Sequence, residues 1–206
     1  INWVELHENL YCIDLQQSVD EYLQKDLSKK RYKQYLSSLK KMKQKGSFRF
    51  EFYHNEKALH FWKEFLNTEG SGWKKKAGTS LLQTETPRKH LYLLFEQACK
   101  ESVLCYSHIV FNGTPIASEF GFFHESIYYG FKTGRLETYD KFAPGSALII
   151  ELVKYLITHH PEISMINMMP KDYSYKHWYA SSTNNRCSTY LLFNNTCRGK
   201  LAHTLY

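Results

Sequence analysis

One carboxylate stands in the middle of an apolar segment of this sequence. Glu119 belongs to Ala117-Ser-Glu-Phe-Gly121, and the pattern of the flanking residues is typical of a β-strand. Burial there raises the pKa of a carboxylic acid, because a low-dielectric surrounding disfavours the charged form. Glu119 is therefore a candidate general base near neutral pH. The alternative is a glutamate on a solvated face that pairs with a neighbouring lysine.

A second feature is the tripeptide Pro144-Gly145-Ser146, which precedes a strongly apolar segment from Ala147 to His159. It predicts a helix that begins there. The first N–H groups of a helix lack intrahelical partners and lie at its positive end, where phosphates bind. We expect Gly145, Ser146 and Ala147 to bind the phosphates of a cofactor, together with the cation Lys132. The alternative is that Pro-Gly only begins the helix, with Ser146 as its cap.

An aromatic segment near the C-terminal end contains two further charged candidates, Asp172 and Lys176. Lys176 has Tyr173, Tyr175 and Trp178 as neighbours in the sequence. It could bind a phosphate or carboxylate of a substrate, or stack as a cation on an aromatic ring. Both interpretations stay open, and we treat Asp172 and Lys176 as candidate catalytic residues.

Charge and composition restrict the class of protein. The 206 residues carry a formal net charge of +7, and nine Lys or Arg face one acid, Asp26, between Lys25 and Lys45. This excess favours an anionic partner, although a solvated helix face would have the same composition. A hydrophobic content of 43% supports a packed core and argues against disorder.

The sequence predicts neither a membrane span nor a metal site. No apolar run is long enough to cross a bilayer, and the histidines have no ligand spacing with acids or cysteines. The five cysteines are scattered, so we expect free thiols in a reducing cytoplasm. The first residue is Ile1, and no secretion signal follows, so we expect a cytoplasmic piece of a longer protein.

Periodicity predicts the elements that position these residues. Asn112-Gly113 between two alternating runs is a strong hairpin signal. We expect an α/β (α+β) fold: a mixed sheet with an antiparallel meander, a crossover helix and helices on both faces. Residues 1–46 are expected to be an extension with a basic helix that ends a preceding lobe, and 47–206 the main domain. Helices are expected at 17–45, 55–67, 87–101, 147–159 and 172–179, and strands at 48–53, 103–111, 114–123, 127–132, 164–168 and 186–193.

Three stretches carry a family resemblance. The segment Glu69-Gly-Ser-Gly-Trp-Lys-Lys-Lys-Ala-Gly-Thr79 resembles the Glu-x-x-x-Trp-Lys-x-x-x-Gly-Thr loop of the CelD/BcsL-like acetyltransferases, which are associated with cellulose biosynthesis. Tyr139-Asp-Lys-Phe-Ala-Pro-Gly145 is similar to that family's tyrosine followed by Ser-Pro-Gly, and Tyr175-Lys176 with Trp178 to its Tyr-Lys-x-x-Trp. The sequence departs from the family pattern at Asn167, where Asp is usual, and at Lys171, where Gly is usual.

The resemblance implies a GNAT-like acyltransferase related to Fem-type aminoacyl transferases. It implies an acyl-coenzyme A donor and a small-molecule or saccharide acceptor, such as a sugar or sugar nucleotide. It also implies that Glu69, Trp73, Lys74 and Trp178 form the acceptor pocket or its lid.

Two alternatives stay open. The donor could be an aminoacyl-tRNA, with the basic segment 25–45 in contact with phosphates. The chain could also be a non-catalytic lobe that binds a polyanion. A fold by itself does not separate these functions, because one scaffold supports many chemistries.

Overall fold

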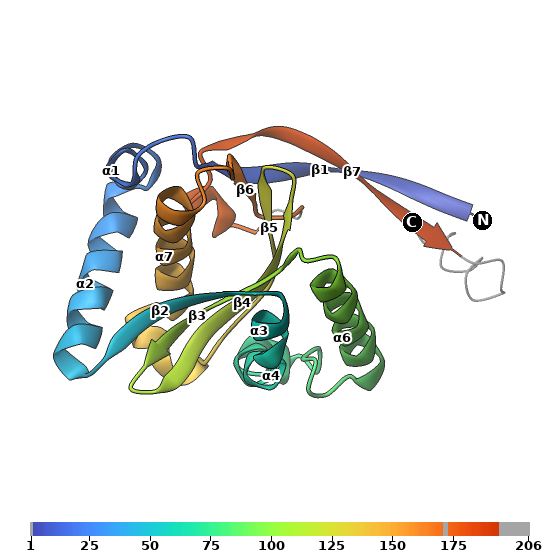
Figure 1. Cartoon of the computed structure of the whole chain (residues 1–206), viewed down its shortest axis with the longest axis horizontal. Helices are drawn as coiled ribbons and strands as arrows, with labels where there is room; N and C mark the ends of the chain where they lie inside the picture. Colours follow the sequence, from blue (N-terminus) through green and yellow to red (C-terminus); the bar gives the residue numbers. More distant parts are fainter. Residues whose placement is uncertain (1, 171–172, 194–206) are drawn as a thin grey trace.

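A computed structural model describes residues 2–170 and 173–193 of the chain. Its centre is one seven-stranded sheet with the order β2-β3-β4-β5-β6-β1-β7 (Figure 1). β2 to β5 form an antiparallel meander, and β6 is parallel to β5. The expected mixed sheet is confirmed. The strands are β1 (Asn2–Asp14), β2 (Phe48–His54), β3 (Leu104–Phe111), β4 (Thr114–His124), β5 (Ile127–Arg135), β6 (Met165–Asn167) and β7 (Ser182–Phe193).

The predicted hairpin is present at its predicted turn. Phe111 pairs with Thr114, and Asn112 and Gly113 between them have φ values of 50° and 76°. Two successive residues with positive φ match the right-handed twist of the flanking strands, which explains the preference for Asn-Gly.

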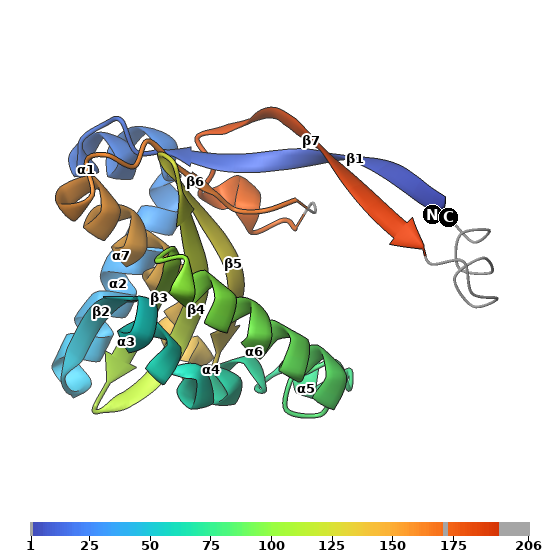
Figure 2. The same ribbon diagram turned by 45° about the vertical axis from the view of Figure 1, so that its right-hand side comes forward.

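Helices cover both faces of the sheet, as expected (Figures 1 and 2). One face packs against the group α3, α4 and α6, and the other against α2 and α7. The crossover helix α7 connects β5 to its parallel neighbour β6. The helices are α1 (Val19–Glu21), η1 (Tyr22–Asp26), α2 (Lys29–Lys45), α3 (Asn55–His60), α4 (Trp62–Glu69), α5 (Trp73–Lys76), α6 (Glu85–Lys100), η2 (Glu137–Phe142), α7 (Pro144–His159) and η3 (Lys176–Trp178).

Each face has its own apolar core. Phe65, Phe95 and Phe120 are fully buried between β4 and the group α3, α4 and α6. On the other face, Val153 and Leu156 of α7 are fully buried in a cluster that also contains buried residues of α2 and the sheet. Successive side chains of β4 therefore point into two buried cores, which explains the apolar composition of this strand.

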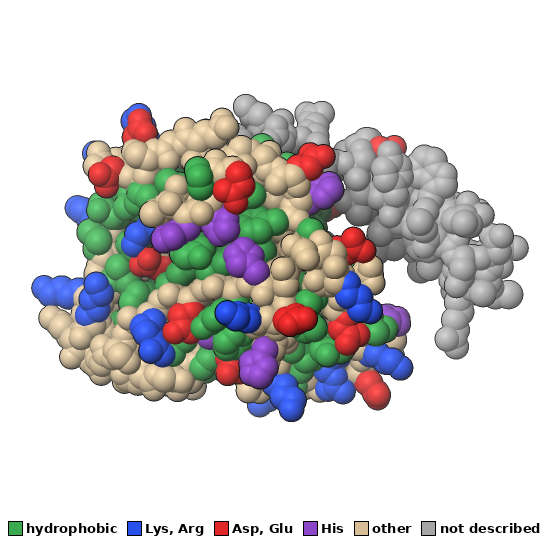
Figure 3. Space-filling model, in the orientation of Figure 1, with side chains coloured by type: hydrophobic (Ala, Val, Ile, Leu, Met, Phe, Trp, Pro, Cys, Tyr) green, Lys and Arg blue, Asp and Glu red, His purple; other side chains and the backbone are tan. Residues whose placement is uncertain are grey.

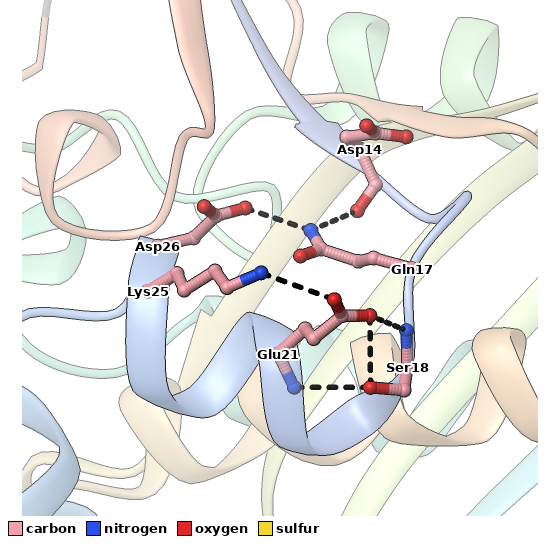
Figure 4. Close-up of polar contacts among 6 residues, drawn as sticks. All are labelled: Asp14, Gln17, Ser18, Glu21, Lys25 and Asp26. Atoms are coloured by element: carbon pink, nitrogen blue, oxygen red, sulfur yellow. Dashed lines mark hydrogen bonds and ion pairs between the residues drawn. The ribbon is translucent and has the colours of Figure 1, made fainter.

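The predicted helix over 17–45 is interrupted. Leu27 is extended with ψ 123°, and Ser28 begins α2 by accepting a hydrogen bond from the Arg31 amide. The helical segment before this break begins with a capping box, in which Ser18 and Glu21 bond to each other's backbone amides (Figure 4). The Ser18 amide and the Lys25 ammonium lower the pKa of Glu21 to about 2. A serine cap is a competing start signal that helical periodicity alone does not reveal.

Strand β1 was not predicted. It pairs with β6 at Cys12–Asp14 and with β7 along Asn2–Leu10, so that β1 and β7 extend together away from the helices (Figure 2). The assignment of residues 1–46 to a preceding lobe stays a prediction.

The sequence also led to expectations about membrane spans, metal sites and cysteines. Within residues 2–170 and 173–193, no helix is long and apolar enough to cross a membrane, and no group of three or more potential ligands could hold a metal ion. Cys12, Cys99 and Cys105 are free thiols. The side chains of Cys187 and Cys197 lie outside the described part. On the face shown in Figure 3, several histidines lie among hydrophobic side chains.

Candidate active site

The parallel strands β5 and β6 separate after a short pairing, and a cavity lies at the point where they separate. β5 pairs with β6 only through residues 127–129 and then continues to Arg135 without that neighbour. A cavity of about 1020 Å³ lies along this free edge, the start of α7 and the segment after β6. Seven predicted site residues line it: Glu69, Glu119, Lys132, Gly145, Ser146, Lys176 and Trp178.

Glu119 has the surroundings that its sequence context predicted. Its side chain lies on the α7 face of β4, and the residue is only 6% exposed. The Tyr128 hydroxyl donates a hydrogen bond of 3.0 Å to Oε1 of Glu119. Burial raises the pKa of Glu119 to about 7, and the Tyr128 hydrogen bond opposes part of that rise. Glu119 can therefore exchange a proton near neutral pH.

A glycine on β4 makes room for this pair. A Cβ at Gly121 would lie 2.4 Å from the Tyr128 hydroxyl, which no real side chain tolerates. Gly121 thus allows the fully buried Tyr128 ring to lie across β4 and reach Glu119. Tyr128 was not among the predicted site residues, because only the strand register brings it to Glu119.

The N-terminus of α7 reaches the same cavity. Its N-cap residue Ala143 is in the left-handed region, with φ 46° and no side-chain cap, so Ser146 is not the cap. The Ala147 amide makes the first intrahelical bond, to the Ala143 carbonyl at 3.1 Å. The amides of Gly145 and Ser146 come before that bond, and both residues line the cavity. Ala147 is 1% exposed and does not line it.

The Ser146 side chain has a separate role. Its Oγ accepts a hydrogen bond of 2.7 Å from the Tyr179 hydroxyl. This bond joins the start of α7 to the aromatic segment 173–179. Because Oγ is the acceptor in this bond, both the Ser146 hydroxyl proton and its backbone amide can still be donated to a ligand.

On the opposite face of the sheet, Glu69 and Lys132 approach each other. The Glu69 side chain is fully buried and accepts a hydrogen bond of 2.9 Å from the Leu81 amide. Lys132 Nζ lies 4.0 Å from Glu69 Oε1. A Cβ at Gly134 would lie 2.4 Å from the Glu69 nitrogen, so this glycine lets the end of α4 rest directly on β5.

Lys176 is a buried anchor. It is 2% exposed, and Nζ donates hydrogen bonds to the carbonyls of Met169 (2.6 Å) and Pro170 (2.8 Å). These bonds tie Met169 and Pro170 to η3. Its catalytic role stays a prediction.

For three other predicted site residues, the structure describes the backbone at most. Asp172 is outside the described residues. The backbones of Trp73 and Lys74 begin α5, and their side chains lie outside the described part. Their roles stay predictions.

The basic helix contributes to the site in a way that the sequence did not indicate. Arg31 of α2 places its guanidinium carbon 3.2 Å from the ring centroid of Trp178, and both residues line the cavity. Gln34, one turn further along α2, also lines it and accepts a hydrogen bond of 2.9 Å from Arg31. The charge run was visible in the sequence, but which of its residues reaches the cavity was not.

Comparisons with known proteins agree with this fold. The sequence model of the acetyltransferase (GNAT) domain family matches residues 29–177. No curated protein matches the sequence significantly.

Several solved structures are similar in fold. A conserved protein of unknown function from Bacteroides thetaiotaomicron is 12% identical, with a TM-score of 0.58 over 90% of this chain and 61% of that one. FemX is 8% identical, with a TM-score of 0.55 over 81% of this chain and 54% of its own. L-PGS from Bacillus licheniformis is 12% identical, with a TM-score of 0.50 over 84% and 49%. This chain thus spans about half to three fifths of the structures it resembles.

Proposed function

We propose an activity for this chain, which belongs to the acetyltransferase (GNAT) domain family: transfer of an acyl group, in the simplest case acetyl, from acyl-coenzyme A to an amine or hydroxyl. The observation that carries this proposal is the buried carboxylate of Glu119 on the wall of the cavity that also receives the start of α7. The three sequence motifs support placement within the CelD/BcsL-like branch, and with it a sugar or sugar nucleotide as acceptor and a cytoplasmic location.

Several groups that line the cavity suit the donor of this reaction. The Gly145 and Ser146 amides supply N–H donors and the positive end of the α7 dipole for the pyrophosphate of the donor. The free edge of β5 offers backbone groups to the amides of the pantetheine arm. Lys132 lines the same cavity from the opposite face of β5, where it approaches Glu69.

Glu119 would act on the acceptor. Its carboxylate takes the proton from the amine or hydroxyl, whose lone pair forms the new bond to the thioester carbonyl carbon. The carbon–sulfur bond then breaks, and the thiolate leaves with that electron pair. The thiolate takes up a proton from the site or from water, so that acylated acceptor and free thiol are the products.

Donor binding tests the proposal without knowledge of the acceptor. Acetyl-coenzyme A is expected to raise the Tm of the wild-type protein, because a ligand that binds only the folded state stabilises it. Desulfo-coenzyme A, which keeps the phosphates and lacks the sulfur, should do the same. Absence of a shift at millimolar concentrations of both would contradict the proposal.

An aminoacyl-tRNA donor is the second candidate. It is favoured by one observation: Arg31 and Gln34 of the basic helix line the cavity. The fold similarity to FemX is consistent with it. In that case tRNA binding should weaken steeply with salt and with Lys33→Glu on the exposed side of α2, whereas coenzyme A should cause no shift. A salt-dependent polyanion interaction without turnover of either donor would instead identify a non-catalytic binding lobe.

A further inference from the structure

Three aromatic side chains are exposed at the cavity. Among the described residues, the large hydrophobic side chains that are strongly exposed are four leucines and the aromatic residues Tyr173 (48%), Tyr175 (37%) and Trp178 (37%). All three aromatic residues lie within one short segment and line the cavity. Rings left in water beside a cavity mark a surface that a ligand covers.

The two tyrosines form a surface with a defined orientation. Their ring centroids are 6.0 Å apart, and their planes differ by only 15°. Lys176 supports the pair from the buried side, because its Nζ lies 5.5 Å from the Tyr173 centroid and is bonded to two backbone carbonyls. A ring ligand would therefore meet a preorganised platform, which lowers the entropic cost of binding.

The platform lies beside the carboxylate. Burial is the main reason that the pKa of Tyr175 is raised to about 12, and the nearby charge of Glu119 is the second. Both side chains line the same cavity. A ligand stacked on Tyr175 would therefore lie in the cavity whose wall carries Glu119.

The remaining wall combines apolar side chains, among them Leu148, Ile149 and Met168, with several polar and charged groups. Arg31 covers one face of Trp178, and Gln34, Lys132 and Glu119 also line the cavity. A purely apolar ligand would desolvate these groups without pairing them, which is costly. The matching ligand has one apolar face and many hydrogen-bonding groups at its rim. A pyranose with equatorial hydroxyls has this shape, because its axial hydrogens form an apolar face.

We propose that Tyr173 and Tyr175 form the acceptor subsite and bind the pyranose ring of a saccharide by stacking. The inference rests on the proposed function, since it assigns the acceptor of the same reaction. One ring hydroxyl then lies toward Glu119 as the group to be acylated, while Arg31 and Gln34 bind hydroxyls at the rim.

Saturation-transfer NMR with two probes, cellotetraose and chitotetraose, tests the subsite without any donor. The wild-type protein is expected to transfer saturation to the axial C–H protons of at least one probe. Tyr173→Leu and Tyr175→Leu, which keep an apolar side chain but remove the ring, should each weaken that binding about tenfold. Tyr173→Phe should bind as the wild type does, because it keeps the ring.

Leu94→Ala is the matched control, because Leu94 is exposed on α6 and does not line the cavity. It should leave saccharide binding unchanged. Since Tyr173 and Tyr175 are exposed, their variants are expected to fold, which a thermal melt checks. Equal binding by the wild type and both leucine variants would overturn the inference, as would failure of the wild type to bind either probe.

Adenosine monophosphate tests the main alternative ligand of this subsite, a nucleotide. A nucleobase also stacks on aromatic rings. If adenosine monophosphate binds through Tyr173 and Tyr175 and displaces the saccharide probe, the inference is overturned in favour of a nucleotide subsite. The acetyl-coenzyme A shift is recorded in parallel. A donor shift without saccharide binding rejects the subsite alone, whereas ring-dependent saccharide binding without a donor shift supports the subsite and rejects the acyl-coenzyme A proposal.

Discussion

Tyr128 and Glu119, on adjacent antiparallel strands, are joined by a hydrogen bond of 3.0 Å from the tyrosine hydroxyl to the carboxylate Oε1. Both side chains are buried, and Tyr128 is fully inaccessible to solvent. The bond stabilises the charged form of Glu119 against the cost of burial. It also restricts the direction in which the carboxylate can turn, so Tyr128 is a positioning residue in the proposed reaction.

Glu119→Gln is expected to lower kcat by about 10² to 10⁴, because the amide keeps the shape but cannot accept the proton. The measurement is steady-state turnover with acetyl-coenzyme A and an accepted saccharide or amine. Donor binding by thermal shift should stay unchanged. Full turnover by a folded Gln variant would remove Glu119 from the mechanism.

The acid limb of the pH profile reports the same carboxylate. In the wild type, kcat/KM should rise with pH through about 7, where Glu119 loses its proton. Tyr128→Phe removes the hydrogen bond that lowers this pKa, so the rising limb should move to higher pH. A variant with lower activity and an unshifted limb would show that Tyr128 has only a packing role.

Protein stability should depend on pH through Glu119. Its folded pKa of about 7 lies above the ordinary value of 4.5, so the folded state binds this proton more tightly than the unfolded state. The free energy of unfolding should therefore fall as pH rises from about 4.5 to 7, by roughly 3 kcal/mol at most, and then level off. Glu119→Gln should lose less stability than the wild type between pH 5 and pH 8 in urea titrations.

Glu21→Gln is the matched control for that experiment. The pKa of Glu21 is lowered to about 2, so its stabilising contribution is complete above the ordinary value of 4.5 and is lost only as pH falls toward 2. Its loss of stability should be equal at pH 5 and pH 8. An identical pH dependence in the wild type and Glu119→Gln would contradict the assigned pKa of Glu119.

Gly145→Val tests the donor site at α7. Gly145 does not have a left-handed φ, and the nearest atom to an added Cβ is Arg135 Cδ at 3.6 Å, so the fold should tolerate the change. The added side chain would crowd an anion that approaches the Gly145 and Ser146 amides. We expect an increase of about tenfold in the donor KM with an unchanged Tm. Lys33→Glu, which lies outside the cavity, should leave the donor KM unchanged.

Local patterns in the sequence were sufficient for most of the framework. Asn112-Gly113 specified the β3–β4 hairpin, and Pro144-Gly145 before an apolar run specified where α7 begins. The mid-strand position of Glu119 indicated a buried carboxylate with a raised pKa as one of two interpretations, and the structure agrees with that one. These features depend on neighbours within a few residues, and such interactions can be read directly from the chain.

Tertiary structure alone decided which groups meet. Arg31 and Trp178 are far apart in the sequence but stack in the cavity, and Tyr128 reaches Glu119 only because the register places Gly121 beneath its hydroxyl. β1 joins the sheet by pairing with β6 and β7, which begin more than 150 residues later. Such contacts depend on strand order, register and helix packing, and these are set by the burial of the whole core rather than by any local signal.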